Sequence, residues 1–416
     1  MTSLAASPAQ AQSPAADPTA YVEKGTAQFR RTCWALFAGG FATFALLYCV
    51  QPMLPVLSVA FALSAAQSSL VLSVSTVTLA VGLLFTGPLS DAVGRKPVMV
   101  TALCAAALCT LLGPLMPNWH ALLLMRALVG LSLSGLVAVA MTYLSEEIHP
   151  QHLGLSMGLY ISGNALGGMS GRLISGVLVD FFSWQVAVAT LGALALFAAL
   201  LFWRLLPDSR HFRPTPLSFA NLASGLRLHL SDRGLPWLFL EAFLLMGSFV
   251  TLFNYIGYRL LEAPYALSMS WVGLLSVVYL SGTYSSTQAG LLADRLGRHR
   301  VFWPVILLML GGLLLTLLSS LLAILAGLLL FTFGFFAAHS LASSWVGRRA
   351  LQARGQASSL YLFSYYLGSS IVGTLGGFFW QHGGWTGVGL FIAALLAVAL
   401  LVALHLSRLP PKQPQA

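Results

Sequence analysis

Charged residues are scarce in this chain of 416 residues, because Asp, Glu, Lys and Arg together make up only 8% of it. Soluble domains carry about 25% of such residues, so an ordinary soluble enzyme is excluded. Acidic residues are the scarcest, with 11 Asp and Glu against 21 Lys and Arg and a net charge of +10. In a chain with 58% hydrophobic residues, this excess is typical of the cytoplasmic loops of a membrane protein, and it does not indicate nucleic-acid binding.

Patterns that bind metals, cofactors or nucleotides are missing as well. The four cysteines form no CxxC pair, and their spacing fits neither a disulfide framework nor a zinc site. The sequence has no HExxH motif, no Walker loop and no nucleophile with a base at a readable spacing. We therefore expect no enzymatic activity, no cofactor, no metal ion and no ATP-driven pump.

Long apolar segments fill most of the chain. A helix needs about 20 apolar residues to cross a bilayer, and the sequence predicts twelve such helices. The expected ranges are 32–60, 66–89, 97–116, 120–146, 152–180, 184–206, 236–261, 270–293, 300–319, 321–346, 353–380 and 385–406. If 301–338 formed a single span, the count would be eleven and the C-terminus would lie outside.

The expected organisation is an all-α polytopic membrane protein with two six-helix bundles. A disordered cytoplasmic tail at 1–28 precedes a first bundle at 29–206, and a polar linker at 207–234 leads to a second bundle at 235–406 and a tail at 407–416. When the chain is threaded from a cytoplasmic N-terminus, nearly all Lys and Arg residues fall in inner loops and tails. The positive-inside rule therefore predicts that both termini are cytoplasmic.

An internal repeat supports the two bundles. The segment GPLSDAVGR, from Gly87 to Arg95, recurs 203 residues later as GLLADRLGR, from Gly290 to Arg298. A second match has an offset of 201 and pairs the glycines of 152–180 with those of 353–380. Parallel repeats of this kind are typical of transporters with a substrate site at the midplane between two pseudo-symmetric halves.

The repeated loop follows the pattern GxxxDxxGR, with a lysine after the first copy. Its residues are Gly87, Asp91, Gly94, Arg95 and Lys96 in the first copy and Gly290, Asp294, Gly297 and Arg298 in the second. The pattern resembles the signature loop of the major facilitator superfamily. The resemblance implies the major facilitator fold and a conformational latch on the cytoplasmic side, to which Glu146 would contribute. The alternative is a hairpin whose positive charge only sets the topology.

Longer strings extend the resemblance to residues 30–405. FALLYCVQPMLPVLS, MTYLSEEIHP and GQASSLYLFSYYLGSS are similar to the YnfM-like branch of bacterial inner-membrane transporters, also called the acriflavine-sensitivity family. That branch is regarded as a group of exporters. The resemblance implies a multi-pass protein of the bacterial inner membrane that acts as a monomer, moves a small molecule through the lipid bilayer and uses a proton gradient.

Two arginines fall inside expected helices. Arg126 begins RALVG, which resembles a second signature of the superfamily, and Arg172 lies at a similar depth in the next helix. A cation inside the bilayer costs at least about 2.5 kcal/mol on insertion scales, so such residues usually face a partner or a cavity. One hypothesis is that both bind the anionic group of a substrate. The alternatives are structural contacts with carbonyl groups for Arg126, and snorkelling to the outer surface for Arg172.

Other polar side chains in the spans are candidates for coupling and binding. Glu241 is the one carboxylate expected within a span rather than at its end, which suggests a protonation site, or else an interfacial acid near Arg233. His339 is a second candidate for proton coupling, or a satisfied neutral histidine. The remaining candidates could line a polar pathway or hold helices together: Asn164, Tyr48, Tyr255, Tyr361 and Tyr365.

The sequence is compatible with two functions. The first is proton-driven export of amphipathic or toxic compounds, which the family and the aromatic residues favour. The glycine-rich stretch GNALGG at 163–168 resembles the antiporter signature of drug exporters, with Asn164 in place of its proline. The second is proton-coupled transport of small organic anions, which Arg126 and Arg172 favour.

Overall fold

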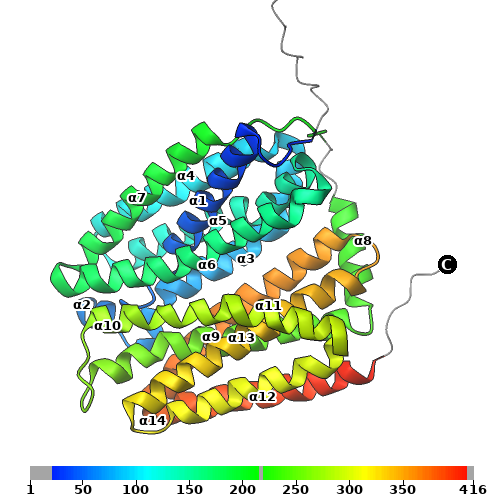
Figure 1. Cartoon of the computed structure of the whole chain (residues 1–416). Coiled ribbons are helices and arrows are strands. Elements are labelled where there is room, and N and C mark those ends of the chain that lie inside the picture. Colours follow the sequence, from blue (N-terminus) through cyan, green and yellow to red (C-terminus); the bar gives the residue numbers. More distant parts are fainter. Residues whose placement is uncertain (1–20, 215–218, 410–416) are drawn as a thin grey trace, which may run out of the picture.

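The computed structural model of the chain describes residues 21–214 and 219–409, and within these ranges the regular secondary structure is helical. The two halves of the chain form two bundles that lie one above the other in Figure 1, joined by the segment that contains α8 (Phe219–Leu230). We call the end of the molecule that carries α8 and the end of α14 the linker face, and the other end the closed face.

The first half consists of seven α-helices and the short 3₁₀ turn η1 (Gly113–Leu115), and sequence features explain where several of the helices begin. Ser64 and Gln67 form a reciprocal capping box at the start of α3. Gly94 separates α3 from α4 with a φ of 114°, a left-handed conformation that favours glycine. The helices are α1 (Ala27–Tyr48), α2 (Leu54–Ala60), α3 (Ala65–Val93), α4 (Arg95–Leu112), α5 (Trp119–Glu147), α6 (Pro150–Phe181) and α7 (Trp184–Leu205).

The second half repeats this plan. Gly297, the repeat equivalent of Gly94, separates α11 from α12 and has a φ of 89°. The elements are α9 (Leu235–Leu261), α10 (Met269–Leu274), the 3₁₀ turn η2 (Leu275–Val278), α11 (Tyr279–Leu296), α12 (Arg298–Thr316), α13 (Leu321–Arg349) and α14 (Arg354–Arg408). A break at Gly384, with φ 54° and ψ −146°, divides α14 into two segments.

Two expected helix ranges need correction. The range 32–60 is interrupted between Tyr48 and Leu54, where a turn replaces the helix. The range 270–293 contains the turn η2. The ranges 353–380 and 385–406 are confirmed as two helical segments, because the break at Gly384 divides α14 between them. The predicted separation between 300–319 and 321–346 is confirmed, because α12 ends at Thr316 and α13 begins at Leu321.

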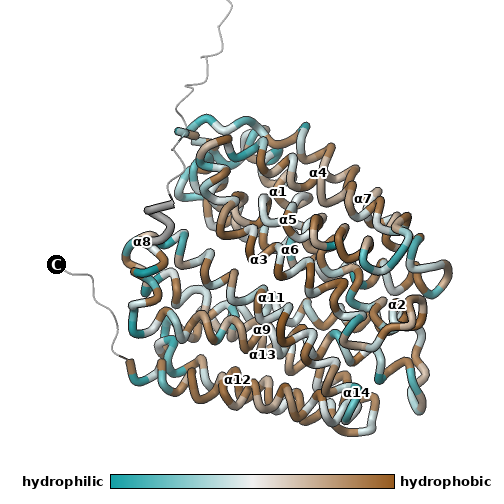
Figure 2. Tube along the Cα trace, turned by 180° about the vertical axis from the view of Figure 1, so that it is seen from behind, coloured by the Kyte–Doolittle hydropathy of each residue, from teal (hydrophilic) through white to brown (hydrophobic). Residues whose placement is uncertain are grey.

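Many of the described helices have the length and composition of membrane spans. Eight helices in the described ranges are long and apolar enough to cross a bilayer, and α14 is one of them with its 55 residues. Figure 2 shows hydrophobic residues along the helices and hydrophilic residues gathered at the ends of the bundles. Large apolar side chains such as Phe197 and Leu322 are exposed on the outer surface, as expected for contact with lipid. Twelve crossings remain a prediction.

The N-terminal tail ends earlier than expected. The sequence predicts a tail that extends to residue 28, but Val22 forms a β-bridge with Ile148 and α1 already starts at Ala27. Residues 1–20 and 410–416 of the two expected tails lie outside the described residues. In the expected linker 207–234, the described part contains α8.

Glycines on α6 allow close packing against α1. A Cβ atom at Gly167 would lie 2.1 Å from the carbonyl oxygen of Phe41, and one at Gly163 would lie 2.4 Å from that of Phe37. Gly171 continues this stripe against Ala45. Small residues at four-residue spacing are the usual means of close helix contact in lipid. The stretch GNALGG therefore serves helix packing.

Candidate functional site between the two halves

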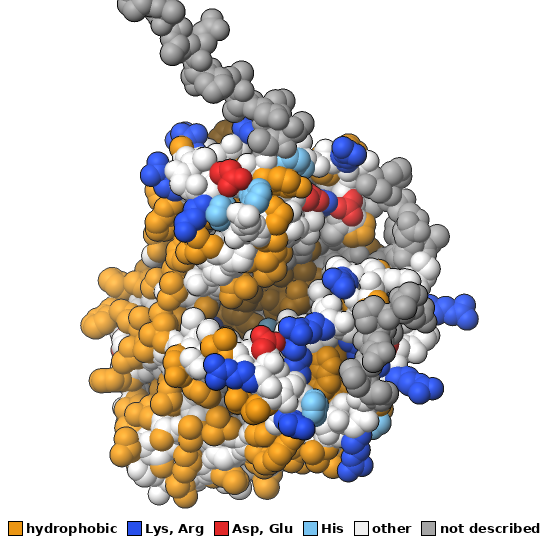
Figure 3. All heavy atoms as spheres, turned by 45° about the vertical axis from the view of Figure 1, so that its right-hand side comes forward, with side chains coloured by type: hydrophobic (Ala, Val, Ile, Leu, Met, Phe, Trp, Pro, Cys, Tyr) orange, Lys and Arg blue, Asp and Glu red, His pale blue; other side chains and the backbone are white. Residues whose placement is uncertain are grey.

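The halves contact each other near the closed face. Gln51 donates a hydrogen bond of 2.8 Å to Asn254, and Ser58 and Tyr258 share one of 2.7 Å. The carboxylate of Asp180 on α6 accepts from the backbone N–H groups that begin α10. Toward the linker face, Figure 3 shows a hollow between the two halves. The structure is therefore closed at one face and open at the linker face.

Arg172 lies where the two halves meet. Its guanidinium lies between two aromatic rings, 4.3 Å from the ring centre of Tyr48 in the first half and 4.8 Å from that of Tyr279 in the second. Its Nε donates to Gln51 over 2.7 Å and its Nη1 to the carbonyl of Gly168 over 2.7 Å. Among the described residues, no carboxylate lies next to the Nη2 atom of Arg172, and Nη2 donates no hydrogen bond. Arg172 does not snorkel outward, since only 4% of it is exposed.

Arg126 has a different environment from Arg172. Its three guanidinium nitrogens donate to the carbonyls of Val71, Leu46 and Leu47 over 3.1, 3.0 and 2.8 Å. The last carbonyls of a helix have no partner inside it, and α1 ends at Tyr48. Arg126 therefore caps the interrupted end of α1, where a cation is also favoured by the helix dipole. This geometry supports the structural alternative for Arg126 over a contact with substrate.

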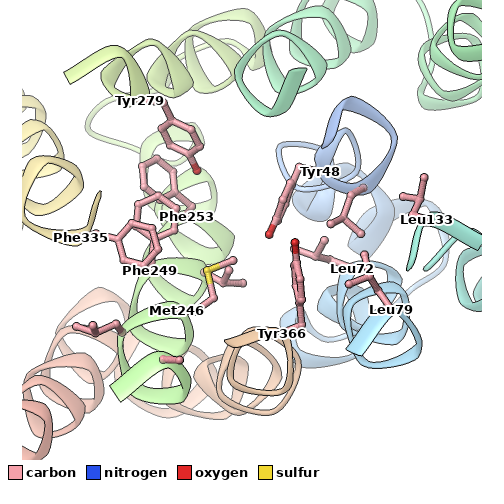
Figure 4. Packing of buried hydrophobic residues seen from close by; sticks show 14 of the residues in the cluster. Tyr48, Leu72, Leu79, Leu133, Met246, Phe249, Phe253, Tyr279, Phe335 and Tyr366 are labelled. Carbon is pink, nitrogen blue, oxygen red and sulfur yellow. The ribbon is translucent and has the colours of Figure 1, made fainter. Parts of the chain in front are cut away.

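Aromatic side chains from both halves surround the central space between the two halves. Figure 4 shows the hydroxyl groups of Tyr48 and Tyr366 pointing toward each other, with Tyr279, Phe249 and Phe253 on the opposite side. Phe249 stacks on Phe335 with ring centres 3.9 Å apart. These rings give the centre an apolar wall that carries hydroxyl groups at a few points, which suits an amphipathic ligand.

The two coupling candidates lie in one region of the second half, and one of them contacts a tyrosine. The hydroxyl of Tyr361 on α14 lies 3.0 Å from Nδ1 of His339 on α13. Glu241 on α9 lies within range of an electrostatic interaction with Tyr361. Glu241 is fully buried, and neither carboxylate oxygen has a hydrogen-bond partner among the described residues. Tyr365 adds to this group, with its ring centre 4.7 Å from that of His339.

Two other candidates lie away from this group. The hydroxyl of Tyr255 donates to the carbonyl of Gly373 over 2.7 Å, which places the ring in the contact between α9 and α14. Asn164 lies beside Gly40 of α1, and its side-chain oxygen has no hydrogen-bond partner within the described ranges. Tyr255 therefore has a structural contact, whereas Asn164 keeps a free acceptor.

The first copy of the repeated loop forms a charge cluster within its own half. Arg95 binds Glu146 through two nitrogens, over 2.7 and 3.0 Å, and also pairs with Asp91. Lys96 pairs with Asp208 of the linker over 2.9 Å. A Cβ atom added at Gly87 would meet open space. In this open state, the described contacts of Arg95 and Asp91 do not join the two halves.

The second copy differs in charge. Asp294 pairs with Arg298 over 3.4 Å and with Arg348 over 3.2 Å. A cation at position 348 thus occupies the region that Glu146 occupies in the first copy. Gly290 has open space around it, like Gly87. The two loops share their backbone turn but not their ion pairs.

The interface also contains residues that the sequence analysis did not single out. Gln51, Asn254 and Tyr279 join Arg172 to the second half. Gln51 and Asn254 are 203 residues apart, which is the offset of the repeated loop. Two amide side chains at equivalent positions of a repeat were therefore a signal that could have been found. No group that could hold a metal ion occurs in residues 21–214 and 219–409.

Comparison with known proteins agrees with this architecture of two repeated bundles around a central site. The sequence profile of the Major Facilitator Superfamily matches residues 36–372 and, in a second match, 263–416. The chain therefore belongs to this superfamily of membrane transporters, and it is not an enzyme.

Relatives from bacteria share most of the sequence. The inner membrane transport protein YnfM of Escherichia coli is 63% identical over 395 residues, which cover 94% of each chain. The uncharacterised transporter YybF of Bacillus subtilis is 46% identical, over 93% of this chain and 96% of that one. The resemblance to the YnfM-like branch is thus confirmed.

Solved structures show the same fold. A bacterial homologue of the human lysosomal transporter Spinster, inward-facing and unoccupied, superposes with a TM-score of 0.75 over 93% of this chain and 98% of that one, at 15% identity. The human organic anion transporter MFSD10 superposes with a TM-score of 0.68 over 90% and 99%, at 19% identity. At these identities the likeness concerns the fold alone.

Proposed function

We propose that the chain is a proton-coupled exporter of amphipathic or toxic compounds in the bacterial inner membrane. The observation that carries this proposal is the aromatic wall around the centre, formed by Tyr48, Tyr366 and Phe249 from both halves. Such a wall can accept apolar rings of different shapes, while a few hydroxyl groups orient a polar end. The resemblance to the exporter branch supports the direction of transport.

The proposed orientation places the linker face in the cytoplasm. Arg298, Arg348 and Arg349 lie at this end of the second half, and cytoplasmic loops of membrane proteins are rich in such residues. The described state is then open to the cytoplasm and closed toward the outside. An exporter would load its substrate from the cytoplasm or the inner leaflet in this state.

Coupling to protons is proposed for Glu241, Tyr361 and His339. Burying an unpaired charge in an apolar environment is costly, so the neutral acid is the form that suits Glu241 in this state. The Tyr361 hydroxyl lies 3.0 Å from Nδ1 of His339, and Tyr361 also interacts electrostatically with Glu241, so the three groups belong to one region of the second half. Opening at the closed face would change the surroundings of these groups and allow the proton to be exchanged.

The test is transport in proteoliposomes with an imposed pH gradient, using a cationic dye as the first substrate. Glu241→Gln should abolish uptake driven by the gradient and should leave exchange of substrate across the membrane intact. Glu262→Gln is the matched control, because Glu262 follows the same helix but is exposed at its end. If Glu241→Gln keeps driven uptake, Glu241 does not carry the coupling.

A second candidate function is transport of organic anions, and one observation favours it. Arg172 offers an unpaired cation between two tyrosines, one from each half, and it meets no carboxylate in the described chain. An aromatic carboxylate would match both the charge and the rings. Arg172→Gln should then remove transport of 2-naphthoate and should spare a cationic dye. Loss of both activities would argue against an anion site.

A further inference from the structure

A pair of amide side chains lies on the axis that relates the two halves. Gln51 follows the interruption of α1, Asn254 lies in α9, and the two are separated by the repeat offset of 203 residues. Equivalent positions in two parallel repeats are related by the pseudo-twofold axis, so a direct bond between them can form only where the halves meet on that axis. The 2.8 Å bond from Gln51 to Asn254 is such a contact.

One glutamine connects Arg172 to the opposite half. The amide oxygen of Gln51 accepts from Nε of Arg172 over 2.7 Å, and its nitrogen donates to Oδ1 of Asn254. All three side chains are buried, where hydrogen bonds are stronger than in water and reinforce one another. Arg172 therefore holds the amide of Gln51 in the orientation that joins the two halves.

Free donors surround this pair. Nδ2 of Asn254 and the hydroxyl of Tyr279 are buried without hydrogen-bond partners among the described residues. Asn254 bonds to Gln51, and the Tyr279 ring lies against the Arg172 guanidinium. Figure 4 shows the Tyr279 hydroxyl directed into the gap across which Tyr48 lies. A guanidinium beside two unpaired donors is the arrangement that an anionic group would satisfy.

We propose that an anionic group of the substrate opens the closed face by taking the guanidinium of Arg172 away from Gln51. A carboxylate binds a guanidinium more strongly than a neutral amide oxygen does. Gln51 then loses the partner that orients its amide, and its bond to Asn254 breaks. This inference rests on the second candidate function, and it adds that Gln51 and Asn254 form the gate which the bound anion releases.

The test measures how far the closed face opens. The substitution Ser73→Cys provides the reporter in every variant, because the Ser73 hydroxyl accepts a hydrogen bond from Thr374 of the other half. A membrane-impermeant maleimide is added from the side of the closed face, with or without 2-naphthoate. We expect the anion to raise the labelling rate of the parent protein several-fold and to have no effect in Arg172→Lys, which loses the planar fork.

Variants of Gln51 and Asn254 test the two residues of the gate separately. Gln51→Met, which can neither accept from Arg172 nor donate to Asn254, should raise labelling without the anion and abolish the effect of the anion. Asn254→Leu should do the same from the other half, and it replaces the first variant if that one does not fold. Ser58→Ala is the matched control, because it removes another bond between the halves that does not involve Arg172. It should raise basal labelling and keep the response to the anion.

The outcomes distinguish the gate from the function on which it rests. If both gate variants label like the parent protein, the amide pair is not a gate. If 2-naphthoate binds only in the presence of Arg172 but leaves labelling unchanged, this inference is wrong and the second candidate function stands. If binding of 2-naphthoate does not depend on Arg172, both are wrong.

Discussion

Replacing Arg126 should weaken the fold rather than remove a contact with substrate. Its three guanidinium bonds hold the interrupted end of α1 and the carbonyl of Val71 on α3. Each bond contributes about 0.6 kcal/mol on the scale measured in bilayers and about 1.5 kcal/mol on the scale for charged hydrogen bonds. The loss of three bonds in Arg126→Gln should therefore cost about 2 to 4.5 kcal/mol of stability. Arg126→Lys keeps the charge but can satisfy fewer carbonyls, and should cost less.

The assay is thermal unfolding in detergent, followed by dye uptake at a temperature where the variants remain folded. Arg126→Gln should unfold several degrees below the parent protein and should retain uptake once folded. Arg30→Gln, at an exposed position of α1, is the control and should unfold like the parent. The reasoning is refuted if Arg126→Gln unfolds like the parent protein while uptake of 2-naphthoate is lost, because Arg126 would then bind the substrate.

Three further predictions concern packing, the latch and topology. Gly167→Ala should lower the unfolding temperature, because a Cβ atom there would lie 2.1 Å from the carbonyl oxygen of Phe41. Gly158→Ala on the same helix is the control and should leave the unfolding temperature unchanged, because its Cβ atom would meet open space. Equal effects of the two substitutions would contradict the packing of α1 on α6. Asp91→Asn should weaken the state that is closed at the linker face, so a cysteine introduced in the cavity should label faster from that face; unchanged labelling at normal protein levels would leave Asp91 as a topology determinant. Alkaline phosphatase fused to the C-terminus should be inactive in intact cells, and an active fusion would show that the C-terminus is outside.

Much of the fold was predictable because it depends on local properties of the sequence. Apolar length predicts membrane helices wherever side chains face lipid, and the repeated GxxxDxxGR loop predicts two halves with a shared turn. Gly94 and Gly297 confirm that turn with positive φ angles of 114° and 89°. The interruption of α1 after Tyr48 was missed because the segment 49–60 is as apolar as the helix before it, so hydropathy gives no sign of the turn.

The roles of the buried polar residues were decided by packing between distant segments. Arg126 and Arg172 look alike in the sequence, since both are single cations in apolar helices at similar depth. The structure places Arg126 against the last carbonyls of α1, and Arg172 between Tyr48 and Tyr279 beside Gln51. A guanidinium binds whichever acceptor lies within hydrogen-bond distance, and that acceptor belongs to another helix. Composition and periodicity therefore establish that a cation is buried, and only the arrangement of the helices decides what it binds.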